Sequence, residues 1–294
     1  MRTLIAIGTA SLLLIQVGIL GGCSGGGERA EPTAREMLGD PPSYAAVREV
    51  YNNRVDGLDR LWARAVVSVS GSDAEGSPFR EQGEGHLQVV RPERVSLTAG
   101  KLGKPMFIYG SNAEQSWWID RSGSPSVAVI GPHAGLTRDD FVALGLPVHP
   151  LELVELLGIS PLPEADRPLV WSRDGTMAGF LTEGVLGYRL TWIDPQTFDP
   201  VRIALLDERG EPLVASMLTG MQGVRIEGDA TRRPRVPDRV VVEVAGTDLS
   251  VRVALNDPRN RRIDGRNFEG ETLLEVYKVD QVERIGGASA DAAR

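Results

Sequence analysis

Histidine is the side chain best suited to metal binding or proton transfer, and the three histidines of this 294-residue sequence show no spacing typical of either role. His86, His133 and His149 are widely separated, and none belongs to a paired motif such as HExxH. His86 lies in a strand pattern, and His149 lies just before Pro150. We therefore expect each histidine to be a surface or helix-capping residue, and we predict no metal site and no cofactor.

Motifs for nucleophilic catalysis and phosphate binding are also missing from the sequence. No GxSxG elbow occurs between a predicted strand and helix, so no motif supports acyl transfer of the α/β-hydrolase type. Segment 100–105 (GKLGKP) has the wrong spacing for a phosphate-binding loop, and Pro105 stands where Ser or Thr would bind Mg²⁺. Carboxylates are plentiful, but their spacing identifies no catalytic pair. We predict that the protein is not an enzyme, with a cryptic hydrolase as the least favoured alternative.

The composition narrows the class of protein further. Lys plus Arg is 32 and Asp plus Glu is 40, which gives a formal charge of −8 and argues against a nucleic-acid partner. An apolar content of 41% is enough for a substantial core. The single cysteine, Cys23, excludes an internal disulfide and a multi-cysteine zinc site.

The residues around Cys23 predict a secretion signal and a membrane anchor. Arg2 precedes an apolar run over residues 4–20, and two glycines then lead to Cys23, as in a cleavable secretory signal. The segment Leu20-Gly21-Gly22-Cys23 resembles the lipobox of bacterial lipoproteins. That resemblance implies a signal peptide over 1–22 and acyl chains such as palmitate on Cys23. The alternative is an uncleaved membrane anchor with an incidental cysteine.

The expected location follows from this anchor. Residues 23–42, with three consecutive glycines and a polar, proline-containing stretch, are typical of a flexible tether. Ser24, not Asp, follows Cys23, and the resemblance to enterobacterial lipoproteins then favours the outer membrane. We expect a lipid-anchored protein of the bacterial envelope that faces the periplasm, with membrane lipid as a partner.

The rest of the chain predicts one α+β domain over 43–284, mainly antiparallel β, followed by a disordered tail over 285–294. Apolar residues recur at three- and four-residue spacing from Tyr44 to Leu61, which indicates an amphipathic helix, and the pattern changes to strand at about 57–62. A helical insert is expected at about 132–168, with one helix after Thr137 and another opened by Pro150. Strands are expected at 79–90, 94–99, 105–110, 115–120 and 126–130, and alternating patterns return over 169–255.

Aromatic residues form the clearest local feature. Trp117 and Trp118 are adjacent in a strand pattern, so one indole should enter the interior and the other should lie outside or under a covering helix. An apolar cavity that binds acyl chains would use a candidate set of six residues, and the alternative is that these are ordinary core side chains. The six candidates are Trp62, Met106, Phe107, Trp117, Trp118 and Trp192.

Several segments resemble the LolA/LolB superfamily of lipoprotein carriers and acceptors. The match is best from Tyr51 to Asp120. It includes the strand 85–90 with its Arg-Pro-x-Arg turn at 91–94, and the hairpin formed by 107–112 and 117–120. The resemblance implies an unclosed half-barrel with covering helices, whose apolar concave face receives acyl chains. It also makes Leu102 the candidate for a protruding apolar loop residue, as in the lipid-anchored acceptor. The helical insert departs from the compact pattern of the family.

These features lead to one functional hypothesis and one alternative. The hypothesis is a lipid-anchored envelope protein that binds acyl chains or lipoproteins, in lipoprotein sorting or outer-membrane insertion, with a periplasmic carrier protein as a further partner. The alternative is a non-enzymatic structural or protein-interaction lipoprotein. An arginine-rich stretch is the second candidate for membrane contact besides Leu102, and a solvated loop is its simpler interpretation. Its residues are Arg232, Arg233 and Arg235.

Overall fold

The structure is a computed structural model, and it describes residues 39–72, 75–133, 148–229 and 231–285. Several expectations fall outside the described residues: the signal peptide with Cys23, most of the expected tether, the helix expected after Thr137, and all but the first residue of the expected tail.

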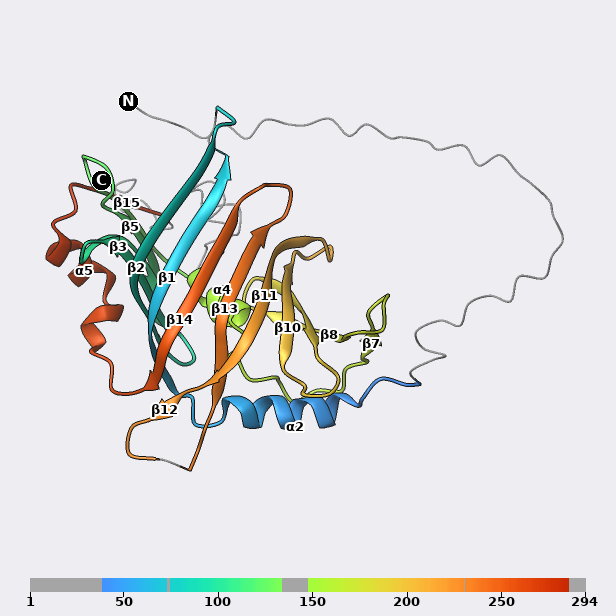
Figure 1. The fold of residues 1–294 in the computed structure, drawn as a ribbon. Coiled ribbons are helices and arrows are strands. Elements are labelled where there is room, and N and C mark those ends of the chain that lie inside the picture. The colour runs from blue at the N-terminus through green and yellow to red at the C-terminus, as the bar shows by residue number, and fades with distance from the viewer. Residues whose placement is uncertain (1–38, 73–74, 134–147, 230, 286–294) are drawn as a thin grey trace, which may run out of the picture.

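Within the described residues, the strands form a single 15-stranded sheet that does not close (Figure 1). The order is β15-β6-β5-β4-β3-β2-β1-β14-β13-β11-β10-β9-β8-β7, with β12 paired to β14. Pairing is antiparallel except for β15 with β6 and β12 with β14. The prediction of an α+β fold, mainly antiparallel and unclosed, is confirmed. The strands are β1 (Arg60–Ser72), β2 (Pro78–Val90), β3 (Arg94–Lys101), β4 (Lys104–Ser111), β5 (Gln115–Asp120), β6 (Val127–Pro132), β7 (Val170–Trp171), β8 (Ala178–Gly184), β9 (Gly187–Ile193), β10 (Pro200–Leu206), β11 (Pro212–Gly223), β12 (Arg225–Ile226), β13 (Arg235–Val244), β14 (Ser250–Asn260) and β15 (Gln281–Arg284).

Three α-helices accompany the sheet in the described part of the chain. Helix α2 begins after Ser43, whose hydroxyl accepts a hydrogen bond from the backbone N–H of Ala46. Gly57, with φ of +72°, follows the end of α2 and turns the chain into β1. The apolar spacing therefore marks buried positions up to Leu61, although the helix itself is shorter. The helices are α2 (Tyr44–Val55), α4 (Pro150–Leu156) and α5 (Gly270–Tyr277), with a short 3₁₀ turn η1 (Gly265–Phe268).

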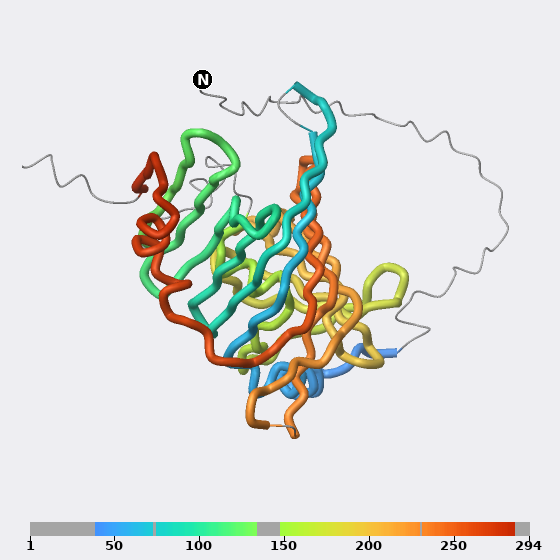
Figure 2. Tube along the Cα trace, turned by 60° about the vertical axis from the view of Figure 1, so that its left-hand side comes forward, coloured from blue at the N-terminus to red at the C-terminus, as the bar shows by residue number. Residues whose placement is uncertain are grey.

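The helices cover different parts of the sheet. We call the face that contacts α4 the inner face and the opposite one the outer face. Helix α2 runs below the strands in Figure 1, and α4 lies behind β13 and β14. Figure 2 shows α5 and β15 beside β5 and β6 at the far end of the sheet. Three apolar clusters result. One lies between α4 and the inner face, one between α2 and strands β8 and β9, and one between α5 and the outer face of β4–β6.

Candidate functional site

Helix α4 occupies the inner face of the sheet. Its residues Leu153, Val154 and Leu156 join the same buried cluster as side chains from β1, β3, β10, β11, β13 and β14. Leu156 is completely buried. Side chains of the protein itself therefore fill this apolar space, at the position where the sequence predicts an apolar concave face.

Hydrogen bonds from neighbouring strands hold both ends of α4. The hydroxyl of Tyr109 on β4 donates to the carbonyl of Val148, just before the helix. The hydroxyl of Ser216 on β11 donates to the carbonyl of Leu156 at 2.7 Å. Neither contact buries apolar surface, so each fixes the position of α4 more than it adds hydrophobic stabilisation.

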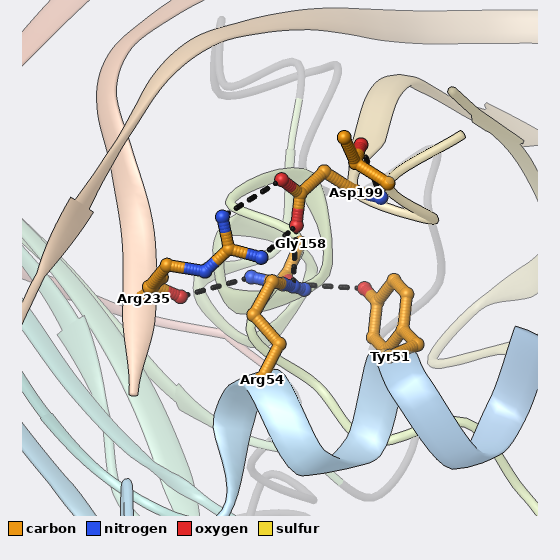
Figure 3. A network of polar contacts seen from close by, with 6 residues as sticks. Tyr51, Arg54, Gly158, Asp199 and Arg235 are labelled. Atoms are coloured by element: carbon orange, nitrogen blue, oxygen red, sulfur yellow. Dashed lines mark hydrogen bonds and ion pairs between the residues drawn. The ribbon is translucent and has the colours of Figure 1, made fainter. Parts of the chain in front are cut away.

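A polar network fixes the chain just after α4 to helix α2 (Figure 3). The carbonyl of Gly158 accepts hydrogen bonds from the Tyr51 hydroxyl at 2.9 Å and from the Arg54 guanidinium. Arg54 also donates to the carbonyl of Arg235 at 3.0 Å, and its Nε lies 3.8 Å from a carboxylate oxygen of Asp199. The Arg235 side chain binds both oxygens of Asp199 at 2.8 and 3.1 Å. Burial lowers the pKa of the Arg54 guanidinium, because removal from water disfavours its charge.

An ion pair links the C-terminal end of α4 to β9. The Arg189 guanidinium lies 3.4 Å from Glu155, and both side chains are less than one-tenth exposed. Arg189 also donates to the hydroxyl of Thr182 at 3.2 Å, and the other oxygen of Glu155 accepts from the backbone N–H of Val185 at 3.3 Å. These hydrogen bonds compensate the loss of hydration that a buried pair incurs.

One of the three histidines caps a helix. His149 is the N-cap of α4: its Nδ1 accepts from the backbone N–H of Leu151 at 3.1 Å, and Glu152 accepts from the His149 backbone N–H at 2.9 Å. The Nε2 of His149 lies 3.1 Å from Nδ1 of His133, whose Nε2 lies 2.7 Å from the carbonyl of Asn112. If both rings are neutral, every contact in this chain has one donor and one acceptor.

A cavity of about 240 Å³ lies beside this histidine pair. It is smaller than the 300–1,000 Å³ usual for a drug-sized ligand. The described residues contain no group of three or more potential metal ligands. Sequence spacing could not have shown the contact between the two histidines, because it depends on how β6 and α4 approach each other. The cavity is lined by Glu93, Ala113, His133, His149, Leu151, Val185 and Leu186.

The structure distributes the six acyl-binding candidates between the two faces of the sheet. Trp117 is buried on the outer face against α5, whereas Trp118 shares the inner face with Tyr109. The prediction that the two indoles point to opposite faces is confirmed. Phe107 also lies on the inner face, with ring centroids 6.1 Å from Trp118 and 6.2 Å from Tyr109. Phe107 and Trp118 are both partly exposed there.

The other three candidates lie elsewhere. Trp62 is on the outer face of β1, where it contacts His86. Trp192 is on the outer face of β9, and its ring lies over Gly179. Met106 precedes Phe107 on β4 and is half-buried. Of the six candidates, Phe107 and Trp118 are therefore the two that lie on the inner face.

Leu102 lies at the tip of the β3–β4 hairpin and is fully exposed. Leu102 and Gly103 have φ of 52° and 75°, the left-handed geometry of a tight two-residue turn. A bulky side chain in this conformation is unusual, because Asn, Asp or Gly adopts it at lower cost. Lys101 and Lys104 flank the tip, and Lys101 forms an ion pair with Glu81.

The three arginine candidates for membrane contact differ in their surroundings. Arg232 has carboxylates of Asp56 and Asp229 at 3.8 Å, and Arg235 belongs to the network around Asp199. Arg233 is exposed and forms no ion pair with the described residues. Two of the three charges are therefore already partly neutralised within the protein.

No family model matches the chain, and no curated protein matches its sequence. Its structure is similar to that of a LolA superfamily protein from Nitrosomonas europaea, at 10% identity, over 77% of this chain and 97% of that chain, with a TM-score of 0.46. It is also similar to a domain named for outer-membrane lipoprotein sorting from Vibrio parahaemolyticus, at 10% identity, over 78% and 97% of the chains, with a TM-score of 0.46. A DUF1329 family protein from Desulfovibrio piger matches at 14% identity, over 78% and 98%, with a TM-score of 0.43.

Proposed function

We propose that this protein is a lipid-anchored component of the bacterial envelope that binds acyl chains of lipids or lipoproteins against the inner face of its sheet. Acylated Cys23 would supply the anchor, in the outer membrane facing the periplasm. The role would lie in lipoprotein sorting or insertion. Among the described residues, no helix is long and apolar enough to cross a bilayer.

One observation carries the proposal: a broad apolar inner face is covered by a helix of only seven residues. Leu153, Val154 and Leu156 fill that space now, and an acyl chain could replace them as apolar partners of the strands. Each methylene group buried there is worth roughly 0.8 kcal/mol. An acyl chain of ordinary length thus supplies enough free energy to compete with a short helix.

Binding then requires α4 to move, because the inner face is filled in the described structure. Polar contacts hold the helix at Val148, Glu155, Leu156 and Gly158. Apart from the ion pair of Glu155 and the Arg54 hydrogen bond to Gly158, these contacts are neutral hydrogen bonds, which have small net free energies in water because solvent replaces the lost partners when the segment opens. Phe107 and Trp118 are the partly exposed aromatic side chains from which an acyl chain would first reach the inner face.

Leu102 supports the membrane part of the proposal. A fully exposed leucine between two lysines presents an apolar side chain for insertion and positive charges for anionic headgroups. Neither feature stabilises the turn itself. An exposed apolar side chain and flanking positive charges are both expected of a hairpin tip that inserts into a bilayer surface.

The test measures binding of dansylundecanoic acid, a fluorescent fatty acid, to the full chain and to two matched variants. Trp118→Gln removes an inner-face indole, and Trp192→Gln removes an equally half-buried indole from the outer face. We expect saturable binding, weakened about tenfold by Trp118→Gln, which corresponds to roughly 1.4 kcal/mol, and within twofold of the parent for Trp192→Gln. No uptake by the parent, or equal loss in both variants, would contradict the proposal.

The alternative, a structural or protein-interaction lipoprotein, gives a different result. The inner face would then take up no fatty acid, and native mass spectrometry would find no lipid with the purified protein. Crosslinking from the exposed Arg233 loop would instead trap one protein partner.

A further inference from the structure

A group of basic side chains lies on the outer face of the sheet, away from α4. Trp62 on β1 is at its centre. The guanidinium carbon of Arg261 lies 4.0 Å from the Trp62 ring centroid, and the His86 ring centroid lies 5.0 Å from it. Arg64, two residues after Trp62 on the same face, is the cross-strand partner of His86. Arg261 and His86 thus contact one indole, and Arg64 lies opposite His86 on the same face.

The positive charges act on one another. The pKa of His86 is lowered first by burial and then by the charges of Arg261 and Arg64. No carboxylate is among the causes that shift this pKa. The cluster is therefore a local region of positive potential within a chain whose net charge is −8.

Neighbouring arginines form ion pairs with aspartates, which the arginines of this cluster lack among the described residues. Arg259 binds Asp257, and that hydrogen bond, with a second one from Arg225, lowers the pKa of Asp257 to about 2. Arg266 likewise binds Asp264. Arg225, Arg259 and Arg266 are thus each paired with an aspartate.

Arg64 and Arg261 have no such match. Neither forms an ion pair with any of the described residues, and Glu84, two positions from His86 on β2, pairs with neither. The Nε of Arg261 is buried and has no hydrogen-bond partner within the described part of the chain. An unpaired, buried guanidinium nitrogen is costly, and an anion bound beside it would remove that cost.

We propose that Arg64, His86 and Arg261 form a binding site for a phosphate group on the outer face of the sheet. The planar fork of a guanidinium matches the oxygens of a phosphate, and contact with Trp62 holds the Arg261 guanidinium in place before the ligand arrives. His86 supplies a further donor through its ring. The phosphate is either the ester group of a lipid headgroup or inorganic phosphate free in solution.

This site is independent of the proposed acyl-binding face, because Trp62 and the α4 contacts lie on opposite faces of the sheet. Loss of phosphate binding would leave fatty-acid uptake unchanged, and loss of fatty-acid uptake would leave phosphate binding unchanged. The two proposals can therefore fail separately.

The test follows the ring protons of the three histidines by NMR in the full chain, with sodium phosphate titrated against sodium chloride at equal ionic strength. A His86→Gln variant assigns the His86 signal. We expect phosphate alone to shift the His86 resonance and to raise its pKa. The double variant Arg64→Gln/Arg261→Gln should weaken this response at least tenfold. Arg202→Gln, which removes an exposed arginine opposite Trp192 on the same face, should leave it within twofold.

A second pair of titrations identifies the source of the phosphate. Tighter binding of dihexanoyl phosphatidylglycerol than of inorganic phosphate would indicate a lipid headgroup. Tighter binding of inorganic phosphate would indicate a free phosphate. Either result supports the site. An equal response to phosphate and chloride, or an unchanged response in the double variant, would overturn it.

Discussion

Substitution of Arg54 is the sharpest test of which contacts hold α4 on the inner face of the sheet. The Arg54 side chain is 2% exposed, and it joins helix α2 to the chain that follows α4. We consider Arg54→Met, which keeps most of the apolar stem and removes the charge. The variant Arg235→Met is the matched control, because that guanidinium binds the same aspartate but is 41% exposed.

The expected cost follows from the contacts. Arg54→Met removes two charge-assisted hydrogen bonds, to the carbonyls of Gly158 and Arg235, each worth roughly 1.5–3 kcal/mol. Removing the buried charge also removes its desolvation penalty, and Tyr51 still donates to Gly158. We therefore expect a net loss of about 2–3 kcal/mol in the free energy of unfolding. Arg235→Met keeps the backbone carbonyl and should cost about 1 kcal/mol.

Urea unfolding followed by far-UV circular dichroism measures both values, and an unchanged m-value shows that the comparison is valid. Because Arg54→Met also loosens the end of α4, the variant should bind dansylundecanoic acid more tightly than the parent. The reasoning is refuted if Arg54→Met is as stable as the parent, or if Arg235→Met costs more.

Three further predictions follow from the same structure. Leu156→Ala leaves a cavity under α4 and should lower the free energy of unfolding by about 2–5 kcal/mol in urea titrations. Fatty-acid uptake should increase in the same variant. A loss below about 1 kcal/mol would mean that α4 is not packed as described. Leu102→Asp should leave stability unchanged and abolish insertion into vesicles containing phosphatidylglycerol, read by a fluorophore at the tip, whereas Lys104→Gln should only weaken it. His86 has a folded-state pKa below its ordinary value of 6.5, so the unfolded chain binds more protons than the folded one. The contribution of His86 to stability should therefore be complete above pH 6.5 and should decline as the pH falls through the folded-state pKa. The slope of stability against pH should be smaller in His86→Gln.

Local features of the fold could be predicted from the sequence because they depend on neighbouring residues. A short strand-like run between Gly, Pro, Asn and Ser residues located β5 at 115–120, where the structure has Gln115–Asp120. Pro150 after His149 indicated the start of α4, and the structure shows His149 as its N-cap. Adjacency of Trp117 and Trp118 was enough to place them on opposite faces, since successive strand residues always point apart.

The candidate site was less predictable, because its contacts join distant segments. The Arg54 hydrogen bonds span 104 residues to Gly158 and 181 residues to Arg235. Arg261 belongs to a stretch of the sequence that also contains Arg259, Arg262 and Arg266. Its position beside Trp62 results from the pairing of β1 with β14. The periodicity that identifies a strand does not specify which strand it pairs with.

The sequence by itself determined a largely antiparallel β protein with a short helix near residue 150, and it indicated a signal segment with a single cysteine at its end. These properties follow from composition, spacing and local hydrogen bonding. Only the tertiary structure decided that α4 fills the inner face, that Trp62 and Trp192 lie on the outer one, and that His133 meets His149. Strand register and long-range packing determine these contacts, and both arise from free energies summed over the whole sheet, beyond any local segment.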